Sequence, residues 1–329
     1  MKAIIWTKYG SPDGLQLQEV ATPVPKDNEV LIKVHAATAA TPDTELRSLK
    51  LPFFFAIPIR LYLGFMRPTR IKILGTEFAG EVGVVGKDVT LYQPGDQVYG
   101  YTGLGMGTYA EYLCLGEKPS ALASVMAKRP TNISYEEAAA VPFGGLEALH
   151  SLRQANIQPG QTVLIVGAGG SIGTYSVQLA KHYGAEVTGV DKTGKLEMMR
   201  SIGADHVIDY TQEDFTKNGQ MYDVILDTIA KSPFSASVRS LNENGTYLNA
   251  NPGPFGGIRT RRASKGSNKK ILTWTAGYTT RNLLELKELV EARTIQPIID
   301  RQYPLEQIAE AHRYVDTGQK KGNVVIKIA

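Results

Sequence analysis

Cysteine is almost absent from this chain of 329 residues, and Cys114 is its only example. A single cysteine excludes an internal disulfide and any metal site that needs several thiolates. The few histidines lack metal-ligand spacing, so each is expected at the surface or in ordinary packing: His35, His150, His182, His206 and His312. We therefore expect no bound metal, and a reducing compartment, the cytoplasm.

Long uninterrupted apolar runs are lacking as well. The most apolar segment, Leu51 to Phe65, is broken by Pro52, Pro58 and Arg60, so it falls short of the ~20 residues that a membrane span needs. The apolar run near Met1 is too short for a signal peptide and is expected to form a first strand. The formal net charge of +4 at pH 7 does not imply a nucleic-acid or membrane partner. We expect no membrane partner.

Acidic residues are missing from one basic segment, residues 259–270, which holds six positive charges in twelve residues. One hypothesis is a contact with nucleic acid. The segment lacks the interleaved aromatic residues that single-strand binding usually uses, and this favours a solvated loop. We therefore do not expect a nucleic-acid partner.

The most informative stretch runs from Thr162 to Lys181, where an apolar, β-branched run ends in a glycine cluster that opens into a helical pattern. This arrangement brings backbone N–H groups against a pyrophosphate. Gly167 allows the sharp turn, and Gly173 lets the helix pack against the strand. The residues expected to hold the pyrophosphate are Gly167, Gly169, Gly170, Ser171, Ile172 and Gly173.

A second predicted strand, Glu186–Val190, follows the helix and ends at Asp191. Asp191 lies 24 residues after Gly167, close to the separation expected between a phosphate turn and an acidic residue that reads the ribose. The combination of strand, turn, helix, strand and acidic end predicts a dinucleotide site. The alternative is a βαβ unit with a purely structural role.

Two domains are expected, because the chain exceeds the roughly 250–300 residues at which single cores stop growing. From Met1 to about Leu122 the pattern is one of short strands and turns, which suggests a small barrel-like β domain. Ser134 and Glu137 form a capping box before a helical stretch that is expected to break near Pro142 and Gly144–Gly145.

Strands and helices then alternate, which predicts a doubly wound parallel sheet in an α/β fold. The predicted elements are Thr162–Val166, Gly173–Tyr183, Glu186–Val190, Leu196–Ile202, His206–Ile208 and Asp223–Asp227, with a further helix at Arg281–Arg293. The tail from Ile295 to Ala329 returns to strand character and is expected to rejoin the first domain. The predicted domains are residues 1–125 with 295–329, and residues 126–294.

The chain resembles the zinc-independent medium-chain dehydrogenases/reductases, in the quinone oxidoreductase (zeta-crystallin-like) branch. The matching pieces run nearly from end to end and include Gly75–Val82, Pro94–Val98, Ala140–Leu146, Gly203–Tyr210 and Gly322–Val325. The resemblance implies a GroES-like β-barrel domain that holds substrate and a Rossmann domain that holds NADP(H). It also implies a homodimer and hydride transfer from NADPH to a quinone or an α,β-unsaturated carbonyl.

Zinc-dependent relatives place a cysteine near position 38 and a histidine after the glycine at position 75, where this chain has Thr38 and Thr76. Relatives that bind NADPH place a lysine and a tyrosine around the adenosine 2′-phosphate, at Lys195 and Tyr210. Asp191 favours a free ribose hydroxyl instead, although the adjacent Lys192 offsets its charge. NADPH is therefore the preferred cofactor, and NADH use stays open.

The resemblance further implies that Phe143 and Gly144 approach the nicotinamide, that Asn323 makes another cofactor contact, and that residues 249–253 pass over the ring. Thr41 is the candidate hydrogen-bond donor to the substrate, because relatives often have Asn-Pro where this chain has Thr41-Pro42. Glu147 replaces a threonine that is common in the family. Two alternatives stay open: an NAD(P)-binding sensor or interaction protein with weak catalysis, and a zinc-free alcohol or aldehyde reductase.

Overall fold

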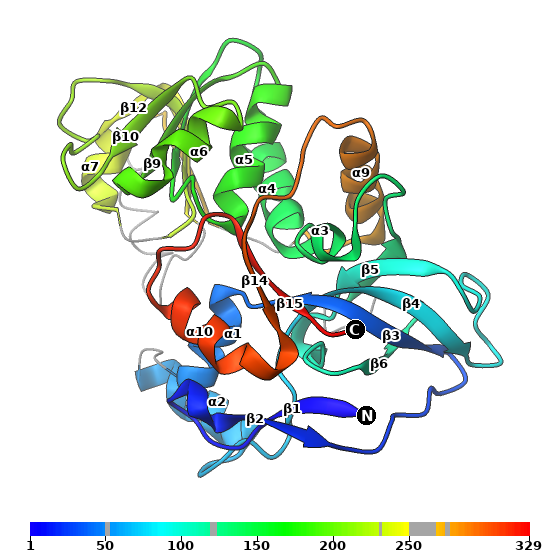
Figure 1. Cartoon of the computed structure of the whole chain (residues 1–329). Coiled ribbons are helices and arrows are strands. Elements are labelled where there is room, and N and C mark those ends of the chain that lie inside the picture. Colours follow the sequence, from blue (N-terminus) through cyan, green and yellow to red (C-terminus); the bar gives the residue numbers. More distant parts are fainter. Residues whose placement is uncertain (50–52, 119–123, 230–231, 250–267, 274–276) are drawn as a thin grey trace. The chain divides into compact units, whose positions relative to one another are not determined.

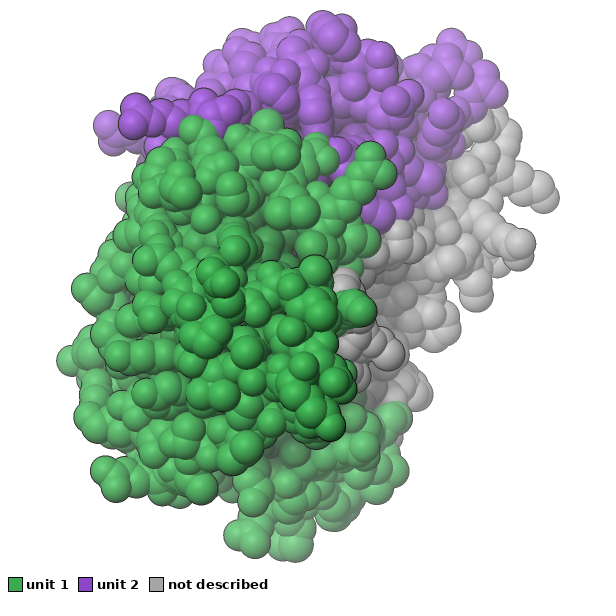
Figure 2. Space-filling view, turned by 90° about the vertical axis from the view of Figure 1, so that its right-hand side faces the viewer, with its two compact units in different colours: residues 1–143, 278–291, 297–329 green, residues 144–277, 292–296 purple. Residues whose placement is uncertain are grey.

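The structure, a computed structural model, describes residues 1–49, 53–118, 124–229, 232–249, 268–273 and 277–329. The chain divides into two compact units, coloured separately in Figure 2. Unit 1 comprises Met1–Phe143, Tyr278–Glu291 and Pro297–Ala329, and unit 2 comprises Gly144–Gly277 and Ala292–Gln296. Each unit is described by itself.

A seven-stranded sheet forms the centre of unit 1, with the order β14-β15-β3-β4-β5-β7 and with β6 paired to β3. The strands are β3 (Glu29–Thr38), β4 (Glu77–Val85), β5 (Gln97–Tyr101), β6 (Tyr112–Gly116), β7 (Val125–Lys128), β14 (Ile299–Pro304) and β15 (Asn323–Lys327). A separate hairpin consists of β1 (Lys2–Trp6) and β2 (Leu15–Glu19). β15 pairs with β3, so the tail lies in the sheet of the N-terminal region.

The helices of unit 1 are α1 (Thr41–Ser48), α2 (Phe53–Leu63), α3 (Tyr135–Ala139), α9 (Thr280–Glu291) and α10 (Ile308–Asp316). The expectation of only strands and turns before Leu122 is wrong for α1 and α2, and the expectation of strand character in the tail is wrong for α10. Proline lies within α1 and α2 and obscured their pattern. In α10 the buried residues Ile308, Ala311 and Val315 have helical spacing that was not recognised.

Unit 2 has a six-stranded sheet in the order β10-β9-β8-β11-β12-β13, with every pair of neighbours parallel. The strands are β8 (Thr162–Val166), β9 (Glu186–Asp191), β10 (His206–Asp209), β11 (Tyr222–Asp227), β12 (Leu241–Asn249) and β13 (Lys270–Thr273). In chain order this is 3-2-1-4-5-6, an order typical of the doubly wound parallel sheet that was predicted. Ligands of such sheets bind where the order reverses, here between β8 and β11. The predicted fold class is confirmed.

Among the described residues of unit 2, the helices that accompany this sheet are α4 (Pro142–Ala155), α5 (Ser171–His182), α6 (Leu196–Ser201) and α7 (Phe234–Arg239) (Figure 1). The predicted capping box of Ser134 and Glu137 starts α3. The break in the helical stretch falls at residues 140–141, because Pro142 suits the first position of a helix. α4 then continues through Gly144–Gly145, so the predicted break at these glycines is wrong.

Residues 126–143 and 278–291 lie in unit 1, whereas the sequence grouped them with the nucleotide-binding part. β7 pairs with β5, which ties this segment to the sheet of unit 1. α9 is held to the same unit because the Tyr99 hydroxyl donates a hydrogen bond to the Leu283 carbonyl at 2.7 Å.

Candidate functional site

The glycine turn predicted to bind phosphate connects β8 to α5 in unit 2. Gly167 has a φ of +79°, and a Cβ there would lie 2.5 Å from Thr228 Oγ1, so the position requires glycine. A Cβ at Gly173 would lie 2.2 Å from the carbonyl oxygen of Gly167. These two glycines therefore set the tight passage from strand to helix.

The N–H groups of this turn are used in two ways. Those of Gly167 and Ala168 donate to the Val190 carbonyl at 2.9 and 3.2 Å, and that of Gly170 donates to Gly167 at 3.0 Å. The N-cap residue of α5 is Gly170, which has no side chain that could cap the helix. The first-turn N–H groups lie at the positive end of the helix dipole. A pyrophosphate would be held by the first-turn N–H groups of Ser171, Ile172 and Gly173. The turn fits a dinucleotide.

Asp191 and Lys195 form a buried ion pair beside the turn, with Lys195 Nζ 3.1 Å from Asp191 Oδ1. The two residues are only 6% and 7% exposed. The Asp191 carboxylate also accepts the N–H of Gly169 at 3.0 Å and that of Lys192 at 2.8 Å. Asp191 therefore fixes the glycine turn, while Lys195 compensates its charge.

This pair leaves no room for a side chain at Gly169, because a Cβ there would lie 2.5 Å from Lys195 Cδ. Lys192 is half-buried. Tyr210 is 47% exposed, and its backbone N–H donates a hydrogen bond to the Asp191 carbonyl at 3.2 Å. The structure thus gathers Asp191, Lys192, Lys195 and Tyr210 at the ends of β9 and β10 in unit 2. A dinucleotide's adenosine ribose would lie at this edge.

Gly144 lies against the start of α5. A Cβ at Gly144 would come within 2.8 Å of the Ser171 carbonyl oxygen and 3.0 Å of Tyr175 Cδ2. The predicted cofactor residue Gly144 is therefore adjacent to the predicted phosphate turn, although the two are separated by 27 positions in the chain.

Phe143 is positioned by a buried acid in unit 1, Glu77. The Phe143 N–H donates to Glu77 Oε1 at 2.8 Å, and the Thr38 hydroxyl donates to Glu77 Oε2. Glu77 is 1% exposed, and burial raises the pKa of its carboxyl to about 7. Glu77 thereby holds the first turn of α4, where Phe143 lies.

A second buried carboxyl belongs to Asp43 in α1. Its Oδ2 accepts the Ala40 N–H at 2.9 Å and lies 3.2 Å from the Tyr109 hydroxyl. Burial raises the pKa of Asp43 to about 7. The Tyr109 hydroxyl also lies 3.1 Å from His312 Nε2, so these groups form a buried polar chain between α1 and α10.

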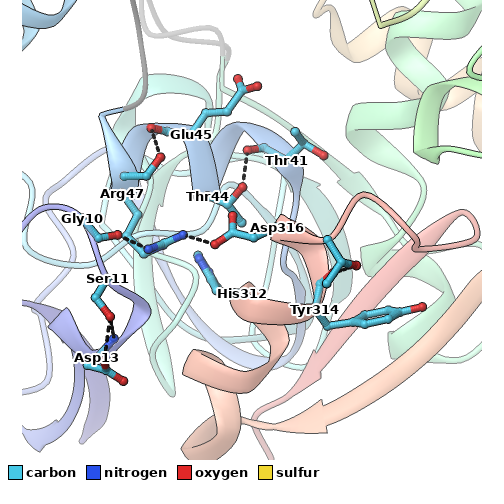
Figure 3. Close-up of polar contacts among 12 residues, drawn as sticks. Gly10, Ser11, Asp13, Thr41, Thr44, Glu45, Arg47, His312, Tyr314 and Asp316 are labelled. Carbon is cyan, nitrogen blue, oxygen red and sulfur yellow. Dashed lines mark hydrogen bonds and ion pairs between the residues drawn. The ribbon is translucent and has the colours of Figure 1, made fainter.

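His312 is neutral at ordinary pH, since burial and then the positive charge of Arg47 lower its pKa to about 3. Arg47 is itself 1% exposed. Figure 3 shows its guanidinium between the Gly10 carbonyl and the Asp316 carboxylate, and it donates one hydrogen bond to each. The cluster is built from residues near both ends of the chain, and the two hydrogen bonds and the burial of Arg47 indicate a structural role.

Thr41, the predicted substrate donor, is the exposed first residue of α1, and its carbonyl accepts the Thr44 hydroxyl at 3.0 Å (Figure 3). Asn323 is 2% exposed and donates its backbone and side-chain N–H groups to the Ile298 carbonyl at 2.8 and 3.2 Å. Asn323 therefore has a structural role, and its cofactor contact stays a prediction. Residues 250–253 and 259–267 lie outside the described residues.

Within the described ranges, no group of three or more histidine, cysteine, aspartate or glutamate side chains is arranged to hold a metal ion. Thr76, at the position where zinc-dependent relatives have histidine, is 7% exposed and its carbonyl accepts the Thr102 N–H. In the same part of the chain, no helix is long and apolar enough to cross a membrane.

The buried acid Glu77 was not recognised as a site residue from the sequence. The available signal was a glutamate directly before the apolar run Phe78–Gly80, since buried charges in strands need partners. His312 and Tyr109 gave no such signal, because their contacts join segments that are 203 positions apart.

The unit 2 fold and the glycine turn before α5 define a dinucleotide-binding class of protein. Residues 26–124 match the model of the alcohol dehydrogenase GroES-like domain, and residues 202–326 match that of the zinc-binding dehydrogenases. The 2-methylene-furan-3-one reductase of Solanum lycopersicum is 32% identical, covering 99% of this chain and 79% of that protein. The chloroplastic NADPH-dependent alkenal/one oxidoreductase of Arabidopsis thaliana is 30% identical, with the same coverage.

Among solved structures, the quinone oxidoreductase from Coxiella burnetii matches with a TM-score of 0.88 and 29% identity, covering 100% of this chain and 99% of that one. The chain belongs to the medium-chain dehydrogenase/reductase family, in its quinone oxidoreductase branch. The predicted GroES-like and Rossmann combination is confirmed.

Proposed function

We propose that this protein is an NADPH-dependent oxidoreductase that transfers hydride, without zinc, to a quinone or an α,β-unsaturated carbonyl. The observation that carries the proposal is the glycine turn Gly167–Gly173, which leads into the amino end of α5 at the reversal point of the unit 2 sheet. Relatives with the same organisation are named as reductases of this kind.

The proposed acceptors share one chemical feature, a carbon–carbon double bond made electron-poor by conjugation to a carbonyl. Such an acceptor takes hydride at its β-carbon, and the resulting enolate oxygen then needs a hydrogen-bond donor and a proton. A Lewis acid is not required for this step, whereas simple alcohol oxidation relies on one to stabilise the alkoxide. Thr38 and Thr76 at the zinc-ligand positions support the zinc-free mechanism.

Bound NADPH would supply the hydride, and the residues of unit 2 would hold and orient it. The first turn of α5 would bind the pyrophosphate. Lys195, Lys192 and Tyr210 would surround the adenosine 2′-phosphate. Because Lys195 already compensates the charge of Asp191, the carboxylate repels that phosphate less than an unpaired acid would.

In unit 1, Thr41 would donate a hydrogen bond toward the developing enolate oxygen. Phe143, Gly144 and Asn323 would contact the cofactor near its reacting end. Glu77 is a positioning residue in this scheme, since it accepts the Phe143 N–H at 2.8 Å and so fixes the start of α4.

The decisive test is an assay of purified protein with NADPH and NADH in parallel, using quinones, enals, enones and saturated aldehydes, with and without EDTA. We expect oxidation of NADPH by the conjugated acceptors, unaffected by EDTA. Turnover only with saturated aldehydes would instead identify a zinc-free aldehyde reductase. Cofactor binding without turnover across the panel would replace the enzyme proposal by the sensor or interaction role.

We further propose a homodimer and a cytoplasmic location. β13 is at the edge of the unit 2 sheet, where a strand of a second copy would extend the pairing. Light scattering would measure the mass in solution. Cell fractionation would test the location, and the relative from Arabidopsis thaliana is chloroplastic.

A further inference from the structure

Helix α2 of unit 1 has apolar residues on both of its sides. Leu63 is 2% exposed and, with Ile59, packs on the core of the unit. On the other side, Ile57 and Leu61 are four positions apart and so share one face, and they are 42% and 67% exposed. α2 lies at the periphery of unit 1, at the lower left of Figure 1.

The chain after α2 continues this exposed apolar surface. Phe65 and Met66 are 66% and 89% exposed, and Tyr62 at the end of the helix is 53% exposed. Contiguous exposed apolar groups of this kind mark an interaction site rather than scattered surface residues. We refer to the following exposed residues together as the α2 surface: Ile57, Arg60, Leu61, Tyr62, Phe65, Met66, Arg67, Arg70 and Lys72.

The charge of the α2 surface has one sign. No aspartate or glutamate occurs between Glu45 and Glu77, while Arg60, Arg67, Arg70 and Lys72 are all exposed. None of these four cations forms an ion pair with a described carboxylate. The guanidinium of Arg70 lies over the ring of Tyr62 at 4.2 Å, and that of Arg60 lies over the ring of Tyr9 at 5.1 Å. Two of the four cations therefore make cation–π contacts.

We propose that the α2 surface binds peripherally to bilayers that contain anionic lipid. Arginines, a lysine and exposed aromatic and aliphatic groups on one short helix and its following loop match the boundary between headgroups and acyl chains. α2 has eleven residues and is about 16 Å long, far less than the ~30 Å of a bilayer core, so it would lie in the interface. The expectation of no membrane partner considered only a spanning segment and the net charge of the whole chain.

The charges disfavour a second copy of the chain as the occupant. A two-fold interface would bring each α2 surface against its own copy. Four unpaired cations from each protomer would then face one another, and such like-charge contacts are costly. An anionic lipid surface has the complementary charge and can also accept the apolar side chains.

The test is sedimentation of the full chain with vesicles of phosphatidylcholine alone and with vesicles that also contain phosphatidylglycerol. We expect binding only to the anionic vesicles, and weakening as salt is raised. Reversing two charges in R67E/R70E should reduce the vesicle partition coefficient about tenfold or more. F65S/M66S, which removes the most exposed apolar side chains, should reduce it about tenfold.

Matched control variants test whether the effects are specific to the α2 surface or follow from any loss of surface charge or exposed apolar area. K87E/K217E reverses two cations whose side chains are 72% and 81% exposed. V24S/L91S replaces apolar residues that are 85% and 55% exposed. Both control proteins should bind vesicles as the wild type does, and an unchanged thermal unfolding midpoint should show that all four variants are folded.

Three results would overturn the proposal: no binding of the wild type to anionic vesicles, equal losses in the control variants, or binding as strong as that of the wild type by F65S/M66S and R67E/R70E. A concentration-dependent dimer that F65S/M66S converts to a monomer would assign the α2 surface to a second copy instead. None of these outcomes depends on the proposed reductase activity.

Discussion

The proposed preference for NADPH depends on one buried pair, Lys195 and Asp191. Lys195 interacts with the Asp191 carboxylate, which also accepts the Gly169 N–H. The lysine therefore has two functions in the proposed site: it neutralises an acid that would repel a 2′-phosphate, and it supplies a cation for that phosphate. A buried cation with both functions cannot be removed without also leaving an uncompensated charge.

We predict that K195M lowers the ratio of kcat/KM for NADPH to kcat/KM for NADH about tenfold, because a charge-assisted hydrogen bond contributes about 1.5–3 kcal/mol. The same variant should lose about 3 kcal/mol of unfolding free energy, because Asp191 is left buried and unpaired. Steady-state kinetics and urea titration measure the two effects. K192M, at a half-buried neighbour, should lower the ratio without the loss of stability. An unchanged ratio in K195M would restrict Lys195 to neutralising Asp191.

Glu77 is the opposite case. It is a buried acid whose hydrogen-bond partners, Thr38 and Phe143, are both uncharged. Burial raises its pKa from 4.5 to about 7, so between these values the folded protein binds more protons than the unfolded chain. Stability attributable to Glu77 is therefore present at low pH and is lost as pH rises through about 7.

We predict that E77Q removes this pH dependence. The glutamine keeps an acceptor for the Phe143 N–H but carries no charge at any pH. Relative to wild type, its unfolding free energy should improve by about 3 kcal/mol between pH 5 and pH 8, as measured by urea titration at each pH. E81Q, on the same strand but exposed, is the control. Parallel pH profiles for E77Q and wild type would contradict the assignment.

At the scale of elements, the start of α5 depends on the absence of a side chain at Gly173. A methyl group there would meet the carbonyl oxygen of Gly167, which belongs to the backbone and cannot rotate away. The helix would have to shift from β8, and its first-turn N–H groups would shift with it. Stability and cofactor binding are thus coupled at one position.

We predict that G173A lowers the unfolding free energy by about 1–3 kcal/mol, the usual range for overpacking, and weakens NADPH binding. Thermal unfolding and fluorescence titration with NADPH measure the two effects. G194A is the matched control in the same unit, since a Cβ at Gly194 has no neighbour within 4 Å. If G173A and G194A were equally stable, the close approach of α5 to the turn would not be a requirement.

For the whole molecule, a feature could be predicted from the sequence when its residues lie close together in the chain. The phosphate turn and Asp191 lie within one βαβ unit, so spacing predicted the strands, the helix and their order. The contacts of Glu77 with Thr38 and Phe143 join three distant segments, and no periodic pattern records them. Likewise, α2 contains a proline and exposes apolar residues, so its pattern gave no clear helix signal.

The family resemblance added what local patterns could not, the pairing of a β domain with a nucleotide-binding unit. The oxidoreductase class agrees with the names of the relatives. The roles of Thr41, Asn323 and Tyr210 stay predictions, because side-chain roles toward a ligand depend on where that ligand binds. Sequence spacing alone does not supply this position.

The return of the tail to the first sheet has a consequence for biosynthesis. β15 is the partner of β3, yet about 285 positions separate Thr38 from Asn323. At roughly 5–20 residues per second, β3 leaves the ribosome about 15–60 s before its partner is made. The segment 144–277 of unit 2 is complete well before then. The part of the protein synthesised first is therefore the last to be finished, and β3 depends during that interval on its other neighbours, β4 and β6.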